Sequence, residues 1–555
     1  MTASLRKNSI AYFTMEIGLL SDIPTYAGGL GTLAGDTIKS SADLKLPLIA
    51  VTLISRLGYF RQELGERGEQ IELSVPWNPS HLLVRWPAEA TVQIQNRDVR
   101  VGAWIYNQQS PTGGAVPVLF LDTDLEANRS DDRTITDHLY GGDDSYRLKQ
   151  EMVLGIGGVR ILEALGTEIR KYHMNEGQSS LLTLELLKRY GMDAEAVKDL
   201  CIFTTHTPVQ AGHDKFDYSL VRDLLGDFID IEVLKKLAGA DRLNMTGLAL
   251  NLSNYINGVA KRHRATSMDM FPGYEIHSIT NGVHSFTWTC PCLQKLFDKY
   301  MPGWANEPEM LLRVNGCPDE EIWKAHMGAK RDLIDQVNRE TDADMDDESL
   351  TIGFARRATM YKRTTFLFSD LQRLRRANHK GTIQIVLAGK AHPRDEEGKK
   401  AIQSVFEIMD ILHNEIKIAY LQDYNMPLAA KMVSGADVWL NTPLPPQEAS
   451  GTSGMKAAHN GVVNFSVLDG WWIEGWIEGV TGWSIGPEPG EDISFEMARK
   501  REIEDFYSKL EYIIIPMFYQ RRDYWMRMMK NSIGMIASFF NSHRMMRRYV
   551  TEAYL

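Results

Sequence analysis

The sequence predicts an α/β protein with parallel sheets in more than one domain, and three observations support this. Apolar, β-rich runs alternate with helical patterns, an order typical of βαβ units. At 555 residues the chain is too long for a single hydrophobic core, and its length corresponds to about three or four domain-sized units. Hydrophobic residues make up 44% of the chain and charged residues 24%, which is an ordinary composition for a globular protein.

The predicted strands fall into two sets. In the first half they are residues 10–15, 48–54, 116–122, 201–205 and 277–280; in the second half they are 350–355, 382–388, 417–421 and 437–441. Between the sets lie an irregular stretch, 281–308, and a helical pattern that continues to about residue 341. We therefore place the domain boundary near residues 282–295. The acidic run 342–348 is expected to be a solvated loop.

Charge and cysteine usage exclude several classes of protein. The net charge of −11 argues against nucleic-acid binding, and no Lys/Arg block indicates an anionic membrane surface. The first residues lack the apolar core of a signal peptide, and the longest apolar runs are too short to span a bilayer. The four cysteines form no disulfide framework or zinc pattern, so a reduced cytoplasm is the expected compartment. His206 and His213 have no carboxylate at helical spacing, and we assign no metal.

The segment from Glu448 to Lys456, Glu-Ala-Ser-Gly-Thr-Ser-Gly-Met-Lys, is the most informative part of the chain. It follows the predicted strand 437–441 and precedes helix-favouring alanines. A strand that passes through such a loop into a helix presents free backbone N–H groups to an anion. A lysine in the first helical turn opposes the helix dipole, so either an anion offsets it or the lysine is held in an imine, as with pyridoxal phosphate. The alternative is a glycine-rich turn with a surface lysine.

Two further motifs also favour anion or sugar binding. Gly28-Gly29-Leu30-Gly31 stands between a predicted strand and a helix, where glycines allow close approach of a phosphate or a sugar ring. Its alternative is a plain turn. Four cations lie within residues 356–363, directly after the predicted strand 350–355, at the sheet edge where open α/β sheets bind ligands. Their alternative is a solvated basic loop.

These motifs, in this order along the chain, resemble those of the α-glucan phosphorylases. That family has Glu-Ala-Ser-Gly-Thr before Gly/Asn-Met-Lys, a Gly-Gly-Leu-Gly loop, and Lys-Arg-x-x-x-Tyr-Lys-Arg, in which Arg356 replaces the lysine of the long-chain members. The resemblance implies two doubly wound Rossmann-like domains facing across a cleft, the GT-B-type glycosyltransferase architecture. It also implies a first domain of residues 1–286, completed by helices 522–555, and a second domain of residues 287–521 that carries the cofactor.

The resemblance further implies pyridoxal 5'-phosphate as cofactor and a role for each motif residue. Lys456 would carry the cofactor, with contacts from Gly29, Gly31, Arg356 and Thr452. Arg357 and Lys362 would hold the substrate phosphate, and His206 would act beside the glucose. The glucose site would also include Glu448, Ser450, Gly451, Asn281, Tyr361, Leu30 and Glu176. Without the other motifs, Asn281 would be read as an ordinary Asn-Gly turn and His206 as a buried structural histidine.

The chain departs from the family at Gln178. The segment Tyr172-His-Met-Asn-Glu-Gly-Gln178 is similar to the family's Asn-Asp/Glu-x-His segment, but glutamine replaces histidine. Glutamine forms hydrogen bonds but does not titrate near neutral pH, so acceptor-glucan binding or turnover is expected to differ. Arg147-Leu-Lys-Gln-Glu151 matches another family helix motif, for which a structural role is open.

The implied activity is phosphorolysis of terminal α-1,4-linked glucose, giving α-glucose 1-phosphate with retention. The expected partners are an α-glucan and inorganic phosphate. The sequence does not decide whether the protein forms a homodimer. Two alternatives remain: a sugar-nucleotide glucosyltransferase of the same architecture, which would need no lysine-bound cofactor, and a catalytically weakened glucan-binding paralogue, for which Gln178 is the hint. Chain-length preference and effector control are not predicted.

Overall fold

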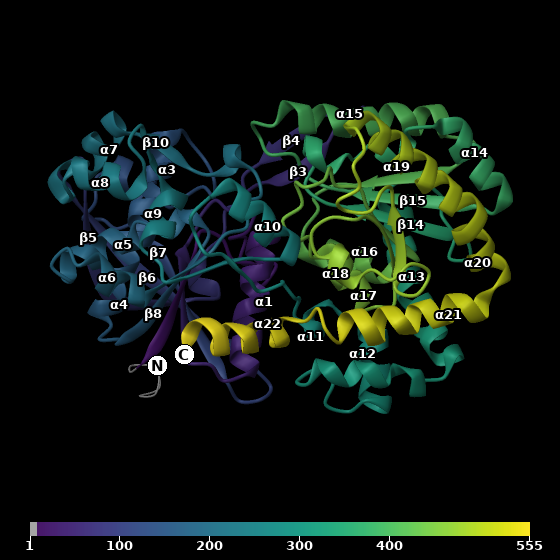
Figure 1. Cartoon of the computed structure of the whole chain (residues 1–555), viewed down its shortest axis with the longest axis horizontal. Coiled ribbons are helices and arrows are strands. Elements are labelled where there is room, and N and C mark those ends of the chain that lie inside the picture. Colours follow the sequence, from purple (N-terminus) through teal and green to yellow (C-terminus); the bar gives the residue numbers. More distant parts are fainter. Residues whose placement is uncertain (1–7) are drawn as a thin grey trace. The chain divides into compact units, whose positions relative to one another are not determined.

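The computed structural model describes residues 8–555, and the chain divides into two compact units. Unit 1 contains the chain up to Phe60, Ser74–Thr280 and Met545–Leu555, and unit 2 contains Arg61–Leu73 and Asn281–Arg544. Each unit has one large sheet with helices packed around it (Figure 1). The α/β class predicted from the sequence is confirmed.

The sheet of unit 1 has the strand order β13-β12-β9-β8-β1-β2-β7-β6-β5. It is parallel from β13 to β7 and antiparallel from β7 to β5. Its strands are β1 (Ser9–Thr14), β2 (Leu48–Leu53), β5 (Val84–Ile94), β6 (Arg97–Gln109), β7 (Ala115–Asp122), β8 (Ile169–Asn175), β9 (Cys201–Thr204), β12 (Tyr255–Gly258) and β13 (His277–Ser278). Because β2 and β8 lie on opposite sides of β1, the boundary between β1 and β8 is a topological switch point, where open α/β sheets bind ligands.

Helices cover both faces of this sheet, so its central strands are buried on both sides. In β1, Ala11 and Phe13 belong to one hydrophobic cluster, while Ile10 and Tyr12 belong to another. The helices of unit 1 are α1 (Gly29–Asp43), α2 (Ser130–Arg133), α3 (Asp144–Met152), α4 (Gly158–Ala164), α5 (Leu182–Arg189), α6 (Ala194–Leu200), α7 (Tyr218–Leu225), α8 (Ile231–Ala238), α9 (Met245–Asn251) and α10 (Lys261–Met270). A small hairpin, β10 (Lys215–Asp217) with β11 (Arg242–Asn244), lies outside the main sheet.

The sheet of unit 2 is parallel throughout, in the order β16-β15-β14-β17-β18-β19. Its strands are β14 (Leu350–Ala355), β15 (Ile383–Ala388), β16 (Lys417–Leu421), β17 (Val438–Asn441), β18 (Val463–Val467) and β19 (Gly482–Ile485). Counted within the unit this is the order 3-2-1-4-5-6 of dinucleotide-binding folds, and its switch point lies between β14 and β17. Two doubly wound sheets, as the family resemblance implied, are therefore present.

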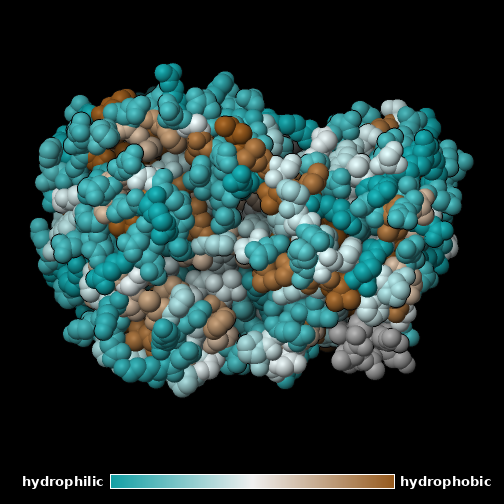
Figure 2. All heavy atoms as spheres, turned by 180° about the vertical axis from the view of Figure 1, so that it is seen from behind, coloured by the Kyte–Doolittle hydropathy of each residue, from teal (hydrophilic) through white to brown (hydrophobic). Residues whose placement is uncertain are grey.

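Unit 2 contains the longest helix among residues 8–555, α13 (Asp319–Glu340), which has 22 residues. Its other helices are α11 (Ser285–Trp288), α12 (Pro291–Tyr300), α14 (Leu371–Lys380), α15 (Glu396–Leu412), α16 (Met426–Gly435), α17 (Ser453–Ala458), α18 (Trp472–Gly475), α19 (Phe495–Lys509), α20 (Ile515–Gln520) and α21 (Arg522–Asn531). Across residues 8–555, each helix is too short or too polar to span a lipid bilayer. The face drawn in Figure 2 is mostly hydrophilic, with hydrophobic residues in small groups.

The boundaries between the two units differ from those expected from the sequence. The boundary falls between Thr280 and Asn281, and only Met545–Leu555 of the C-terminal helices belongs to unit 1. Met545 and Met546, in α22 (Ser542–Tyr549), are buried in a unit 1 cluster, whereas α21 places Trp525, Met526 and Met529 in the core of unit 2. Each of these helical segments therefore follows the sheet against which its apolar residues pack.

The hairpin formed by β3 (Arg61–Leu64) and β4 (Gln70–Leu73) belongs to unit 2, although it lies early in the sequence. The Gln62 backbone N donates to Asp423 Oδ1 at 3.1 Å, and its side-chain amide donates to Gly389 O at 2.9 Å. Gln70 Oε1 accepts from the Ala391 backbone N at 2.9 Å. These bonds attach the hairpin to the loops after β15 and β16.

Candidate functional site

In unit 2 the predicted phosphate-binding cations and the Glu448 loop lie at the switch point of the sheet. Arg356 and Arg357 follow β14 directly, and the Glu448–Lys456 segment follows β17. β14 and β17 are neighbours, so their carboxyl-terminal loops leave the sheet edge side by side and diverge. The fold thus brings together two segments that are about ninety residues apart in the sequence.

The Glu448 carboxylate is the centre of a buried ion cluster. Lys362 Nζ donates to both of its oxygens, at 2.7 and 2.6 Å, and Arg356 Nη2 donates to Oε2. The side chains of all three residues are at most 10% exposed. Arg356 Nε and Nη1 are buried and have no partner in the protein. The cluster holds two cations for one carboxylate, which leaves net positive charge and unused N–H donors at the switch point.

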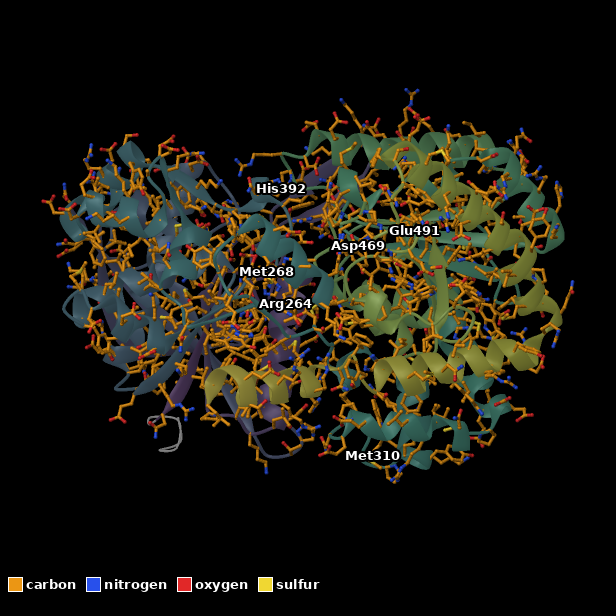
Figure 3. The ribbon with its side chains drawn as sticks, in the orientation of Figure 1. Arg264, Met268, Met310, His392, Asp469 and Glu491 are labelled. Atoms are coloured by element: carbon orange, nitrogen blue, oxygen red, sulfur yellow. The ribbon has the colours of Figure 1, made fainter. Side chains whose placement is uncertain are left out.

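Burial and the two cations act in opposite directions on the pKa of Glu448. Removal from water raises the pKa, because the charged form loses hydration. Lys362 and Arg356 outweigh that effect and lower the pKa to about 2. Glu448 is therefore ionised at neutral pH, and its backbone N donates to Asp469 Oδ2 at 2.9 Å. Asp469, labelled in Figure 3, follows β18 and is 3% exposed.

The loop between Glu448 and Lys456 depends on its glycines. Gly451 has a φ of +74°, in the left-handed region that glycine adopts without strain. At Gly454, a Cβ atom would lie 2.2 Å from Asn464 Oδ1, so only glycine fits there. Ser450 Oγ is buried and has no partner in the protein, and the side chain of Thr452 makes no hydrogen bond as N-cap of α17. The loop therefore offers a buried hydroxyl to a ligand.

Lys456 is 7% exposed, and its Nζ lies 3.7 Å from the centre of the Trp288 ring. One part of the sequence argument for this lysine is wrong. α17 has only six residues, so Lys456 lies in its last turn as well as its first. The dipole of so short a helix gives no reason for or against a cation there. What distinguishes Lys456 is its burial against an aromatic ring, beside a glycine-dependent loop.

Three more predicted site residues belong to unit 2. Arg357 and Tyr361 follow β14, and Asn281 is the first residue of the segment Asn281–Arg544. Arg357 is exposed, whereas the Tyr361 ring lies 4.4 Å from Lys362 Nζ. Asn281 is 3% exposed, its carbonyl accepts from Arg544 Nη2 at 3.0 Å, and its Oδ1 has no partner in the protein. A buried amide oxygen without a partner is costly unless a ligand or water bonds to it.

In unit 1 the glycine loop lies near the switch point between β1 and β8. α1 begins at Gly29, with Gly28 as its N-cap. A Cβ on Gly31 would lie 2.6 Å from Glu16 Oε2, whereas one on Gly28 or Gly29 would have no atom within 4 Å. Leu30, between the glycines, is partly buried. Gly31 is thus required by Glu16, while Gly28 and Gly29 leave the loop open to a ligand.

The segment after β8 holds Glu176 in a backbone conformation that non-glycine residues rarely adopt, with φ of +78° and ψ of 166°. Its carboxylate accepts from the His206 backbone N at 2.8 Å, Thr207 Oγ1 at 2.9 Å and the Gly177 backbone N at 3.0 Å. Burial raises the pKa of Glu176, and these bonds reduce the rise. Strained residues of this kind cluster at functional sites.

His206 follows β9, and its Nε2 lies 2.6 Å from Asn175 Oδ1, so Nε2 is the nitrogen that carries the proton. Burial, together with the nearby His263 and His173, lowers the pKa of His206 to about 3. The imidazole is therefore neutral at physiological pH. It can orient a ligand through hydrogen bonds, but it does not supply a positive charge.

Comparisons with known proteins identify the family. The family model described as "Carbohydrate phosphorylase" matches residues 213–477. A maltodextrin phosphorylase of Thermococcus litoralis is 40% identical over 98% of this chain and 70% of its own length. A glycogen phosphorylase of Aquifex aeolicus is 36% identical over 99% and 86%. The chain belongs to the carbohydrate phosphorylase family. An uncharacterized protein of Methanocaldococcus jannaschii, 31% identical over 98% of this chain and 99% of its own length, has a similar extent.

Within this phosphorylase-family chain, sequence reasoning missed two acidic residues. Asp469 bonds the backbone of Glu448, and Glu16 accepts from the backbone N of Ala27 at 2.6 Å and of Gly28 at 3.2 Å. Each lies in the first loop residues after a parallel strand, and that position could have signalled them. Within residues 8–555, no group of three or more His, Cys, Asp or Glu side chains is arranged to hold a metal ion.

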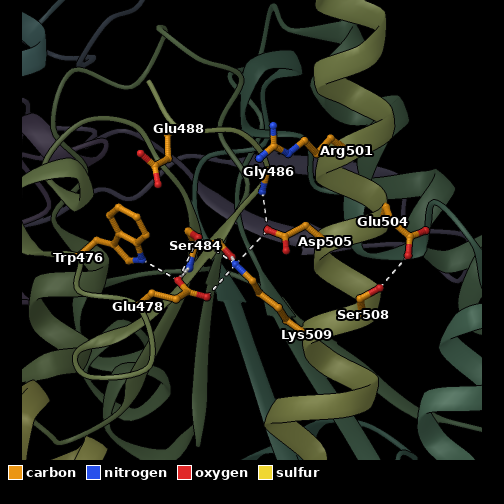
Figure 4. Close-up of a pocket in the computed structure, with 10 residues that line it drawn as sticks. All are labelled: Trp476, Glu478, Ser484, Gly486, Glu488, Arg501, Glu504, Asp505, Ser508 and Lys509. Carbon is orange, nitrogen blue, oxygen red and sulfur yellow. Dashed lines mark hydrogen bonds and ion pairs between the residues drawn. The ribbon is translucent and has the colours of Figure 1, made fainter. Parts of the chain in front are cut away.

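Unit 2 also has a polar hollow of about 500 Å³, which Figure 4 shows between the end of β19 and α19. Its walls include none of the predicted site residues, and many of its polar groups bond one another. Glu478 accepts from Trp476 Nε1 at 2.7 Å and from Ser484, and it pairs with Lys509 at 2.8 Å. The lining residues are Trp476, Glu478, Ser484, Gly486, Glu488, Arg501, Glu504, Asp505, Ser508 and Lys509. We assign no ligand to it.

Proposed function

We propose that this protein is an α-glucan phosphorylase, which uses inorganic phosphate to release terminal α-1,4-linked glucose as α-glucose 1-phosphate with retention. Family membership supports the reaction class, and relatives that match nearly the whole chain are named maltodextrin and glycogen phosphorylases. The observation that carries the proposal is the buried Lys362–Glu448–Arg356 cluster at the switch point of unit 2. Its net positive charge and unused Arg356 donors suit a phosphate.

The chain's own residues suit a division of work between binding phosphate and binding glucose. Lys362 and the exposed Arg357 would hold the substrate phosphate and stabilise charge as it develops. Glu448, with a pKa of about 2, would accept hydrogen bonds from sugar hydroxyls as a carboxylate. The neutral His206 would orient the sugar. The remaining glucose contacts would come from Ser450, Gly451, Asn281, Tyr361, Leu30 and Glu176.

The residues of unit 2 also fit pyridoxal 5'-phosphate as cofactor. The fit is supported by a buried primary amine, Lys456, and by two kinds of buried donor without a protein partner, Ser450 Oγ and the Nε and Nη1 groups of Arg356. Lys456 would carry the cofactor, and Arg356 and Thr452, with Gly29 and Gly31 of unit 1, would hold its phosphate. The cofactor supplies a phosphate with a second pKa of about 6, suited to proton exchange near neutral pH.

The proposal is tested by measuring glucose 1-phosphate formed from maltoheptaose or glycogen plus inorganic phosphate. We expect formation that requires both substrates, and that falls at least ~10²-fold in Lys362→Ala, because one preorganised charge on the transferring group is lost. Lys299→Ala is the matched control, since Lys299 in the same unit pairs with Glu321 at the surface. Glucosyl transfer from a sugar nucleotide without phosphorolysis would instead establish the glucosyltransferase alternative.

A further inference from the structure

A chain of side-chain contacts in unit 1 connects the glycine loop to Gln178, the position at which this sequence departs from its family. The Gly28–Gly31 loop follows β1, and Gln178 follows β8, so the two ends lie on neighbouring strands at the switch point of the sheet. Between them stand Tyr140, Arg147 and Asp214.

At the loop end of the chain, the carboxylate of Glu16 has two different functions. Its Oε2 accepts from the backbone N–H groups of Ala27 and Gly28, at 2.6 and 3.2 Å, and so fixes the residues just before α1. Its Oε1 accepts from Tyr140 Oη at 3.1 Å. Glu16 is 4% exposed. A buried carboxylate bonded in this way transmits the position of the tyrosine hydroxyl to the loop backbone.

In the middle of the chain, Arg147 joins Tyr140 to Asp214. Its guanidinium lies 4.8 Å from the centre of the Tyr140 ring, a cation–π distance. Arg147 Nη2 donates to Asp214 Oδ2 at 2.8 Å, and Nε donates to Glu151 Oε1 at 3.1 Å. Burial and the nearby Glu16 raise the pKa of Tyr140, so its hydroxyl keeps the proton that it donates. The Arg147 guanidinium, which Asp214 and Glu151 hold in place, thus packs against one face of the Tyr140 ring.

At the far end, Gln178 Nε2 donates to the same Asp214 Oδ2 at 3.2 Å. Gln178 is 8% exposed, and its Oε1 is buried without a partner in the protein. The residue at position 178 thus shares an acceptor atom with Arg147. A change there alters the bonding of Asp214, and through it the arginine that packs on Tyr140.

We propose that Tyr140 and Arg147 are positioning residues that hold Glu16 under the Gly28–Gly31 loop and couple this loop to residue 178. The inference rests on the proposed function, in which the loop contacts the cofactor phosphate. It gives the Arg147–Glu151 motif a role beyond helix stability. It also explains why glutamine is accepted at position 178, since the Asp214 contact needs a donor and not a titrating group.

The test measures pyridoxal phosphate binding to the cofactor-free protein, together with the ³¹P resonance of the bound cofactor and the melting temperature. Tyr140→Phe removes one hydroxyl, and we expect about tenfold weaker binding and a shifted ³¹P resonance, the scale of one hydrogen bond to a charged group. Arg147→Lys, which keeps the charge but loses the planar fork, should act in the same direction. Tyr274→Phe is the control, because its hydroxyl bonds Asn251 at 2.8 Å, outside the chain of contacts.

A double-variant comparison tests the coupling itself. Gln178→Ala alone should weaken binding about threefold, but in the Tyr140→Phe background it should have no further effect, because its influence passes through Tyr140. Losses that multiply in the double variant would overturn the coupling. A Tyr140→Phe protein that matches Tyr274→Phe in affinity and ³¹P resonance would overturn the positioning role. Failure of the unaltered protein to bind pyridoxal phosphate would instead contradict the proposed function.

Discussion

Replacing Glu448 by glutamine removes the carboxylate that lies between Lys362 and Arg356 in unit 2. Burial raises the pKa of this carboxyl group, but the two cations outweigh burial and lower the pKa from 4.5 to about 2. Since one pKa unit corresponds to 1.36 kcal/mol, the ion cluster favours the folded state by about 3 kcal/mol at neutral pH. A neutral amide also leaves both cations buried without their counter-ion, so Glu448→Gln should destabilise by about this amount or more.

Urea unfolding at pH 7 measures this loss directly, and a Tm lower by about 6 °C should accompany it. The sign of the pH dependence provides a second check. Because the folded-state pKa lies below the unfolded one, the stabilisation is present above pH 4.5 and is lost as the pH falls towards 2. The difference between wild type and variant should therefore shrink over that window. Glu415→Gln, which removes an exposed partner of Arg375 in the same unit, is the control. Equal stability of Glu448→Gln and wild type at pH 7 would refute the reasoning.

Three further outcomes are expected. Arg357→Ala should retain the pyridoxal absorbance but lose phosphorolysis at least ~10²-fold, and simultaneous loss of cofactor and activity would contradict the separate roles. Gly31→Ala should weaken cofactor binding, because its Cβ would lie 2.6 Å from Glu16 Oε2, whereas Gly316→Ala, at a glycine outside the proposed site whose Cβ would have no atom within 4 Å, should not; equal effects in a cofactor titration would count against the close packing. Gln178→His should leave the cofactor in place and raise phosphate-dependent turnover of maltoheptaose by up to ~10-fold, and no gain would indicate that the surroundings already accommodate glutamine.

Strands and loops were predicted best where hydrophobic pattern and local chemistry agree. β14 and β16 match their predicted ranges, because buried parallel strands are continuous apolar runs bounded by polar loops. β8 was not predicted, because Arg170 and Lys171 interrupt the apolar pattern at the start of this strand. In the structure the Arg170 guanidinium donates to the Tyr554 carbonyl, so a charge sits in a strand with a partner from the C-terminus. Sequence pattern does not reveal such a partner.

The unit boundaries show the same limit. The β3–β4 hairpin reads as an ordinary local turn, and nothing between residues 61 and 73 indicates that its hydrogen bonds go to Asp423 and Gly389, more than three hundred residues later. At the candidate site, local motifs located the glycines, cations and Lys456. Glu16 and the Tyr140–Arg147 contacts were missed, because they arise only when loops from separate strands meet.

The central claim is that Lys456 carries a pyridoxal phosphate cofactor in a glucan phosphorylase, and an absorbance spectrum before and after borohydride, followed by peptide mapping, tests it most directly. We expect a cofactor band that borohydride abolishes, with the label on the peptide containing Lys456, and a folded but colourless Lys456→Ala protein. Lys456 is expected to react because it is a buried amine beside a glycine-dependent loop. A label on Lys362 or Lys390, or a colourless wild type that still transfers glucose from a sugar nucleotide, would contradict the account.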